Sequence, residues 1–136
     1  MSASLSPLAT DPQWRILPES PRALGELRAP DGTRLLTIAF DTHRDIIASI
    51  GYAPGERCGE AFCACAAALC SLARGKAVMA AELLAPADIA EALPCPMDDP
   101  LFYQAVLAVL CLKNALSSFA ETRAADYAAF RQGQQA

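Results

Sequence analysis

Cysteine is the residue type in this chain whose number and spacing could do chemistry. Six cysteines occur in 136 residues, and four of them, Cys58, Cys63, Cys65 and Cys70, lie within thirteen positions. Thiols stay reduced in the cytoplasm, where a cysteine cluster points to metal or sulfur chemistry more often than to disulfides. Free cysteine is also a small hydrophobic residue that is often buried in a core. Each cysteine can therefore be interpreted either as a ligand or as a core residue.

Helical periodicity separates these four cysteines. At 3.6 residues per turn, Cys63 and Cys70 share one face of a helix, and Cys65 points nearly the opposite way. The cluster therefore cannot form one site with four ligands, and it lacks the paired CxxC spacing of a zinc site. We expect Cys65 and Cys70 to lie in the core.

Cys58 is predicted to lie in a loop, followed by Gly59, just before the N-terminus of a helix. The helix dipole and the free N–H groups at that end favour a thiolate. Cys63, in the first turn, shares this field more weakly. Such a thiolate suits a metal ligand or a carrier of persulfide sulfur, and the alternative is an ordinary loop cysteine.

Three strands are expected to precede this helix. The first 22 residues are rich in proline and predict an irregular arm with at most one short turn, pinned to the body by Trp14 and Ile16. Segments 23–28, 33–40 and 45–52 are rich in strand-forming residues, and short turn-like connections join them. The pattern predicts a three-stranded antiparallel meander.

About four helices are expected to follow the strands. An Ala-rich helix over 60–74 is apolar nearly all round and should be central and buried, and a second is expected over 77–84. A third is predicted to start with Asp88 as its cap, and a long fourth with Asp99 as its cap and Pro100 as its first residue. We therefore expect one α+β domain over residues 23–130, with the helices packed on one face of the sheet, and a frayed tail over 131–136.

Composition and charge exclude several function classes. The net charge of −4 offers no surplus of basic residues to bind a nucleic acid. We expect no signal peptide and no membrane span, because the sequence lacks an apolar run of about 20 residues. A cytoplasmic protein is expected. His43, the single histidine, is expected in a solvated hairpin connection, and Asp98 and Asp99 are better explained by helix capping than by acid–base chemistry. No enzyme is predicted, since no nucleophile–base pair or phosphate-binding glycine loop is evident.

Five short motifs, in order, resemble those of the NifU/IscU family of iron–sulfur cluster assembly scaffolds. The resemblance covers about residues 20–120. The motifs are Ser20–Gly25 (SPRALG), Arg57–Gly59 (RCG), Leu72–Lys76 (LARGK), Ala87–Leu93 (ADIAEAL) and Lys113–Leu116 (KNAL).

The resemblance implies a [2Fe–2S] site with three cysteine ligands, of which Cys58 matches one position. The loop that carries the first family cysteine is shortened at residues 29–32, and the third family position falls near Leu107 and Ala108, which carry no thiol. Cys63 and Cys111 would be the substitute ligands. The partners implied are a cysteine desulfurase and cluster-recipient proteins.

Other interpretations of the function remain, because two of the family's cysteines are missing from this chain. The chain could be a family-fold protein without cluster assembly: a sulfur acceptor of the SufE type with one thiol, a zinc-binding protein or a partner-binding module. It could bind no cofactor at all, as an unrelated α+β domain whose cysteines are core residues.

Overall fold

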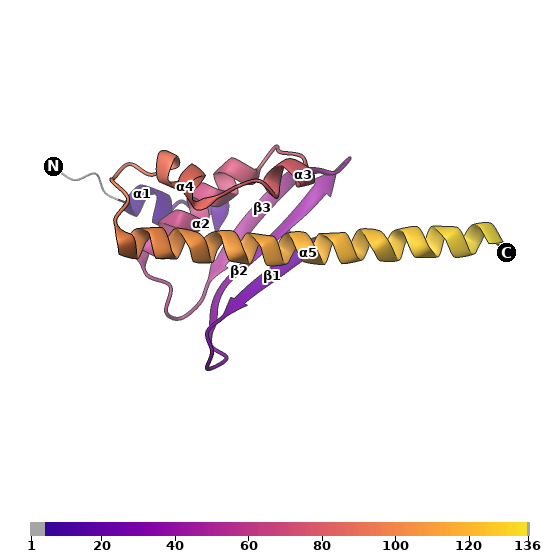
Figure 1. Cartoon of the computed structure of the whole chain (residues 1–136), viewed down its shortest axis with the longest axis horizontal. Coiled ribbons are helices and arrows are strands. Elements are labelled where there is room, and N and C mark those ends of the chain that lie inside the picture. The colour runs from indigo at the N-terminus through magenta and orange to yellow at the C-terminus, as the bar shows by residue number, and fades with distance from the viewer. Residues whose placement is uncertain (1–4, 136) are drawn as a thin grey trace.

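A computed structural model describes residues 5–135 of the chain (Figure 1). The elements in chain order are α1 (Ser6–Ala9), the 3₁₀ turn η1 (Pro12–Trp14), β1 (Ala23–Arg28), β2 (Arg34–His43), β3 (Ile46–Pro54), α2 (Glu60–Ala73), α3 (Val78–Ala81), α4 (Pro86–Ala92) and α5 (Asp99–Gln135).

The three strands form one antiparallel sheet in the order β1-β2-β3, which confirms the predicted meander. Both β2 and β3 are longer than predicted, because the hairpin between them needs only Arg44 and Asp45. These two residues have φ angles of 55° and 61°, the left-handed conformation that two-residue hairpin turns require at both positions. His43 is thus the exposed last residue of β2.

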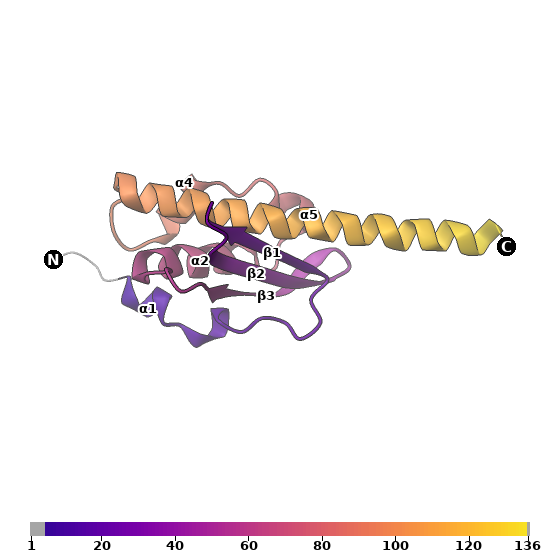
Figure 2. The ribbon, with the colours of Figure 1, turned by 90° about the horizontal axis from the view of Figure 1, so that it is seen from below.

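Helices α2 and α5 supply most of the packing on the sheet, so the predicted α+β architecture is confirmed. Helix α5 packs along β1, and α2 packs against β3 and α5 (Figure 2). Nine of the fourteen residues of α2, from Phe62 to Cys70, are buried consecutively, as expected for a helix that is apolar on every side. The core lies between this helix and the sheet residues Ile38 and Tyr52, both fully buried.

The N-terminal arm is more ordered than predicted, since it contains both α1 and η1. Helix α1 packs on α2, and η1 packs on β3 and α2. Trp14 is buried, as expected, whereas Ile16 is 70 % exposed and pins the arm only through its backbone, which passes close to Gly51. The arm therefore covers the part of the molecule where β3 leads into α2.

Two helix starts differ from the prediction by one to three residues. Helix α4 begins at Pro86, and Asp88 lies in its first turn, where its carboxylate accepts a hydrogen bond from the Ala85 N–H at 2.8 Å. Helix α5 begins at Asp99, and the preceding Asp98 acts as the cap by accepting from the Leu101 N–H at 2.9 Å. In both cases an acidic side chain satisfies a free N–H group.

Helix α5 continues to Gln135, where a frayed tail had been expected from residue 131. Its C-terminal half extends beyond the rest of the molecule (Figure 1). Among the described helices, α5 is long and apolar enough to cross a membrane by length and composition alone. Its first half contacts the sheet, α2 and α4, which is also the arrangement of a core helix.

Candidate functional site

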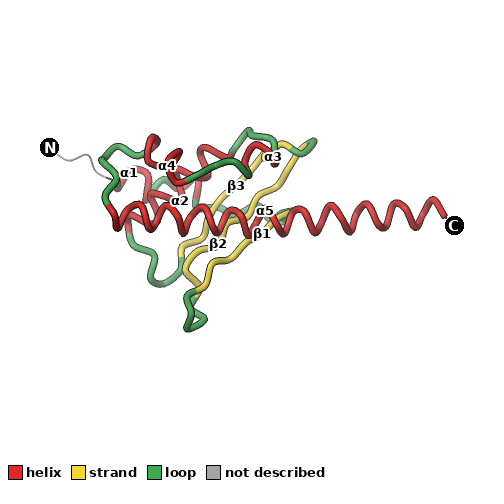
Figure 3. Tube along the Cα trace, in the orientation of Figure 1, coloured by secondary structure: helices red, strands yellow, loops and turns green. Residues whose placement is uncertain are grey.

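A loop joins the end of β3 to the start of α2 (Figure 3), and one cysteine lies in this loop and another in the first turns of the helix. Strand β3 ends at Pro54, and the Cys58 N–H donates to the Gly55 carbonyl at 3.1 Å, which folds residues 55–58 into a tight turn. Gly59 is the extended cap of α2. The Cys63 N–H then makes the helical bond to the Gly59 carbonyl at 3.0 Å, so Cys63 lies one turn inside the helix.

The sulfur atoms of Cys58 and Cys63 are 3.2 Å apart. Cys58 is half-buried and reaches the surface, whereas Cys63 is only 3 % exposed. Two of the three predicted site residues are therefore brought into contact, one from the loop and one from the helix.

Two residues that the sequence did not indicate complete the surroundings of this pair. Tyr52, fully buried on β3, donates from its hydroxyl to the Ala9 carbonyl at 3.3 Å. Arg15, just after η1, donates from Nε and Nη2 to the same carbonyl at 3.0 and 2.6 Å. Its guanidinium also lies 5.8 Å from the centre of the Tyr52 ring. Nothing in the local sequence signals this role, because the arm meets β3 only through tertiary packing.

The two thiols differ in acidity. The hydrogen bond from Cys58, burial, the nearby Arg15 charge and the Tyr52 hydroxyl together set the pKa of Cys63 at about 6: burial raises this pKa, and the other three lower it. The same hydrogen bond raises the pKa of Cys58 above its ordinary value, and burial adds to the rise. The sequence placed the favoured thiolate at Cys58, whereas these shifts lower the pKa of Cys63 instead. The helix dipole acts at this end, but the nearer partners decide which sulfur carries the charge.

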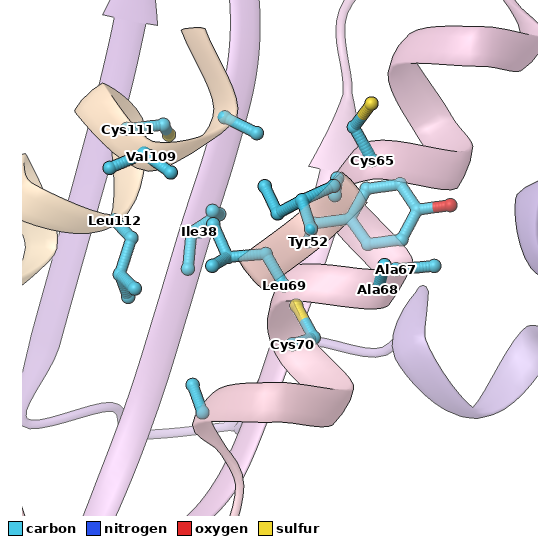
Figure 4. Close-up of a cluster of buried hydrophobic side chains, with 14 of the residues drawn as sticks. Ile38, Tyr52, Cys65, Ala67, Ala68, Leu69, Cys70, Val109, Cys111 and Leu112 are labelled. Atoms are coloured by element: carbon cyan, nitrogen blue, oxygen red, sulfur yellow. The ribbon is translucent and has the colours of Figure 1, made fainter. Parts of the chain in front are cut away.

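Cys111 lies apart from this pair, in the core between α5 and the sheet. Its thiol donates to the carbonyl oxygens of Gly25 and Leu36 at 3.4 and 3.6 Å, and its side chain is fully buried. Cys65 and Cys70 are fully buried on α2, as predicted. Figure 4 shows them with Leu69 on α2 and Cys111 on the neighbouring α5. Burial raises the pKa of Cys65 and Cys111 to about 12.

No group of three or more Cys, His, Asp or Glu side chains is placed to hold a metal ion within residues 5–135. Asp31, in the shortened loop at residues 29–32, is paired with Arg57 at 3.1 Å. A tetrahedral metal with bonds near 2.3 Å would need two thiolate sulfurs about 3.8 Å apart. The Cys58–Cys63 pair is within about 0.6 Å of that spacing, so two ligands for one metal ion are available in the described part of the chain.

A groove of about 730 Å³ lies beside this pair without including either sulfur. It runs between α1, the start of α2 and the segment that leads into α5. Its lining includes Cys95, half-buried, and the apolar Leu5, Met97 and Leu101. The thiol pair and this groove are therefore separate features.

Comparison with known proteins identifies the fold. No protein-family model matches the sequence, and no curated protein sequence matches it. Among solved structures, the chain is similar to one described as a candidate iron–sulfur cluster assembly scaffold protein for the SUF system, FiSufU, from Fervidobacterium islandicum AW-1. The TM-score is 0.59 at 17 % identity, over 82 % of this chain and 93 % of that one.

A second solved structure is a nitrogen-fixing NifU-like protein (N-terminal) from Brucella abortus. It aligns with a TM-score of 0.46 at 15 % identity, over 96 % of this chain and 92 % of that one. At such low sequence identity, the similarity to the Fervidobacterium islandicum structure shows the fold alone. The predicted resemblance is confirmed at that level: the chain has a NifU/IscU-like fold, a three-stranded antiparallel sheet with helices packed against it.

Proposed function

We propose that this protein is an iron–sulfur cluster assembly scaffold or carrier that binds iron or a [2Fe–2S] cluster through thiolates. The observation that carries the proposal is the 3.2 Å contact between the Cys58 and Cys63 sulfurs. It lies on a fold shared with a protein described as a scaffold of that kind. Iron or the cluster is cargo here, and no turnover of a small substrate is proposed.

The chemistry of the pair suits iron. Thiolate sulfur is a soft ligand that favours iron–sulfur clusters. Because Cys63 has a pKa of about 6, one negative sulfur is present at neutral pH. Binding of the first metal ion at Cys63 would then favour loss of the proton from Cys58, since a coordinated thiol is deprotonated. Two coordination positions of that ion stay open for sulfide.

Cys111 can join these ligands only if α5 moves away from β1. The move would break the hydrogen bonds from its thiol to Gly25 and Leu36 and would expose a fully buried side chain. The proposal therefore rests on Cys58 and Cys63, and Cys111 is offered as a third ligand of a rearranged, loaded form. A Cys111→Ala variant that folds and binds iron as the wild type does would remove Cys111 from the ligand set.

The partners proposed are a cysteine desulfurase, which would supply sulfur, and proteins that would receive the cluster. We propose no nucleic-acid or membrane partner, and a cytoplasmic location. The acidic net charge supports the first exclusion, because a phosphate backbone is bound mainly through lysine and arginine.

Anaerobic reconstitution of the full chain with iron and sulfide tests the proposal. We expect charge-transfer absorption bands and bound iron in the wild type, and loss of both in Cys58→Ser and in Cys63→Ser. Cys95→Ser is the matched control, since Cys95 is also half-buried but lies outside the pair. A wild type without thiol-dependent iron would contradict the proposal, as would equal iron in all four proteins.

A second candidate function is favoured by the lack of a third ligand within residues 5–135. The protein would then be a sulfur acceptor of the SufE type, with the half-buried Cys58 receiving a persulfide sulfur from a desulfurase. A persulfide on Cys58 detected by mass spectrometry, with no cluster on reconstitution, would favour it. Zinc that copurifies with the wild type and is lost in Cys58→Ser would instead favour a zinc site.

A further inference from the structure

We propose that Cys58 and Cys63 form a reversible disulfide with a small-molecule disulfide as the oxidant, and that its formation closes the metal-binding site. Disulfide formation rests on the geometry of the two residues alone, whereas the closing of a metal site also rests on the proposed function. Neither role is implied by the ligand set of the fold, because the pairing depends on where this chain places Cys63.

The pairing is specific to these two residues. Their sulfurs are in contact at 3.2 Å, whereas Cys111 donates to backbone carbonyls. The thiols of Cys65, Cys70 and Cys111 are also fully buried, so a reagent in solution cannot reach them in the folded protein. Cys58 is half-buried and offers the accessible sulfur of the pair.

The backbone around Cys58 allows the bond to close. A disulfide requires an S–S distance of about 2.0 Å, so the two sulfurs must approach by about 1.2 Å from their contact. Cys63 is held in α2 by its helical hydrogen bond to Gly59. Cys58 lies outside α2, in the loop before Gly59, so its side chain can approach Cys63 without breaking a helical hydrogen bond. The movement can therefore come from the loop without distorting the helix.

The exchange proceeds in two steps that balance. Cys58 passes its proton to the neighbouring Cys63 thiolate and attacks one sulfur of the external disulfide, which forms a mixed disulfide at Cys58 and releases one thiolate that takes up a proton from water. Cys63, 3.2 Å behind, then loses its proton and attacks the Cys58 sulfur, and the second small thiol leaves. The protein loses two electrons and the one proton that the pair held, and the external disulfide gains the two electrons and, with a second proton from water, leaves as two thiols.

The consequence for the proposed site is direct. A sulfur in a disulfide is no longer a thiolate ligand, so oxidation removes both ligands at once. A metal ion bound between the two sulfurs would in turn keep them from the oxidant. Loading and oxidation of this site are therefore mutually exclusive, and reduction by a small thiol restores it.

Oxidised glutathione added to the reduced, metal-free full chain tests the inference. We expect peptide mapping of the denatured product to give one disulfide between Cys58 and Cys63, so that these two of the six thiols are no longer titratable. Cys63→Ser should stop at a stable glutathione adduct on Cys58, because the second sulfur is missing. Cys58→Ser should stay largely unmodified at Cys63, which is buried, and Cys95→Ser should form the same internal disulfide as the wild type.

A stable glutathione adduct on Cys58 of the wild type, or a disulfide to any other cysteine, would overturn the inference. Circular dichroism of each variant before oxidation shows that it is folded, so that a missing disulfide is not a folding defect. Reconstitution with iron and sulfide is measured separately on the reduced protein. If the disulfide forms but no iron binds, the proposed function is contradicted and the disulfide inference stands. If iron binds but no disulfide forms, the disulfide inference is contradicted and the proposed function stands.

Discussion

The thiol of Cys111 donates a hydrogen bond to the carbonyl oxygen of Gly25, 3.4 Å away, at the point where α5 crosses β1. The contact is possible because the two backbones approach each other closely. A Cβ atom built on Gly25 would meet the backbone of Ala115 and the carbonyl of Cys111. The position of the long helix on the sheet therefore depends on a residue without a side chain in β1.

Gly25→Ala should destabilise the fold by about 3 kcal/mol, because the added methyl group meets backbone atoms that cannot turn aside. Urea denaturation followed by circular dichroism measures the loss. Gly133→Ala is the control: it lies in the exposed part of α5, nothing lies near its Cα, and alanine favours a helix by about 0.5–1 kcal/mol over glycine. A Gly25→Ala protein as stable as the wild type would show that α5 does not sit against β1 in this way.

Asp98 and Asp99 give a paired test of the start of α5. Asp98 accepts a hydrogen bond from the Leu101 N–H, so Asp98→Ala should lower the free energy of unfolding by about 1 kcal/mol. Asp99, exposed in the first turn, interacts only with the helix dipole, and Asp99→Ala should cost about 0.5 kcal/mol. Thermal denaturation of both variants compares them. The reverse order would restore Asp99 as the cap, as its sequence had suggested.

Much of the fold could be predicted because its signals are local. Proline and glycine mark the ends of elements, and the alanine-rich run over Phe62–Cys70 can only be a buried helix, so the meander and α2 follow from the pattern. The prediction of the capping residues was less accurate, since neighbouring aspartates such as Asp98 and Asp99 offer equivalent side chains. The choice between them depends on where the backbone turns.

The site could be predicted only in part, for a physical reason. Cys58 and Cys63 lie five positions apart at a loop–helix junction, so their contact is nearly local. Arg15 and Tyr52 reach the pair from distant segments, and no spacing rule connects them with a cysteine. The acidity of a thiol depends on just such neighbours, which is why the sequence assigned the stronger thiolate to Cys58.

The acidity of the pair predicts how stability changes with pH. The folded protein lowers the pKa of Cys63 to about 6, from about 8.5 in an unfolded chain. Between these two pH values the unfolded state binds more protons at Cys63 than the folded state does. The free energy of unfolding therefore increases as the pH rises, and this contribution is lost as the pH falls through 6. The raised pKa of Cys58 has the opposite sign: the folded state keeps that proton, and stability falls as pH rises above the ordinary range. The contribution of the pair should therefore be largest near pH 8.5.

Thiolate absorbance in the ultraviolet measures this titration directly. The wild type should gain one thiolate with a midpoint near pH 6, well below the ordinary value, and Cys63→Ser should lose that step. In Cys58→Ala the step should move to higher pH, because the main cause of the lowered pKa is the hydrogen bond from Cys58. Cys95→Ser should keep the step near pH 6, because Cys95 lies outside the pair. A single step at the ordinary cysteine pKa in the wild type would show that the two sulfurs do not share a proton.

Arg15 and Arg74 give a matched pair of changes in the contacts of the N-terminal arm. Arg15 bonds to the Ala9 carbonyl and lies over Tyr52. Arg74 lies 5.9 Å from the centre of the Trp14 ring. Each truncation to alanine removes a cation–π contact, and Arg15→Ala also removes two hydrogen bonds to the carbonyl. We expect losses of unfolding free energy of about 1–2 kcal/mol for Arg15→Ala and about 0.5 kcal/mol for Arg74→Ala.

Only Arg15→Ala should change the acidity of the thiol pair. The Arg15 charge favours the Cys63 thiolate, so its removal should move the thiolate midpoint to higher pH and slow the uptake of iron at pH 7. Arg15→Lys keeps a positive charge but not the planar two-point contact with the carbonyl, and it should restore part of the midpoint. Arg74→Ala should leave the midpoint where it is in the wild type. Equal midpoints in Arg15→Ala and Arg74→Ala would mean that the arm covers the cysteine pair without acting on its charge.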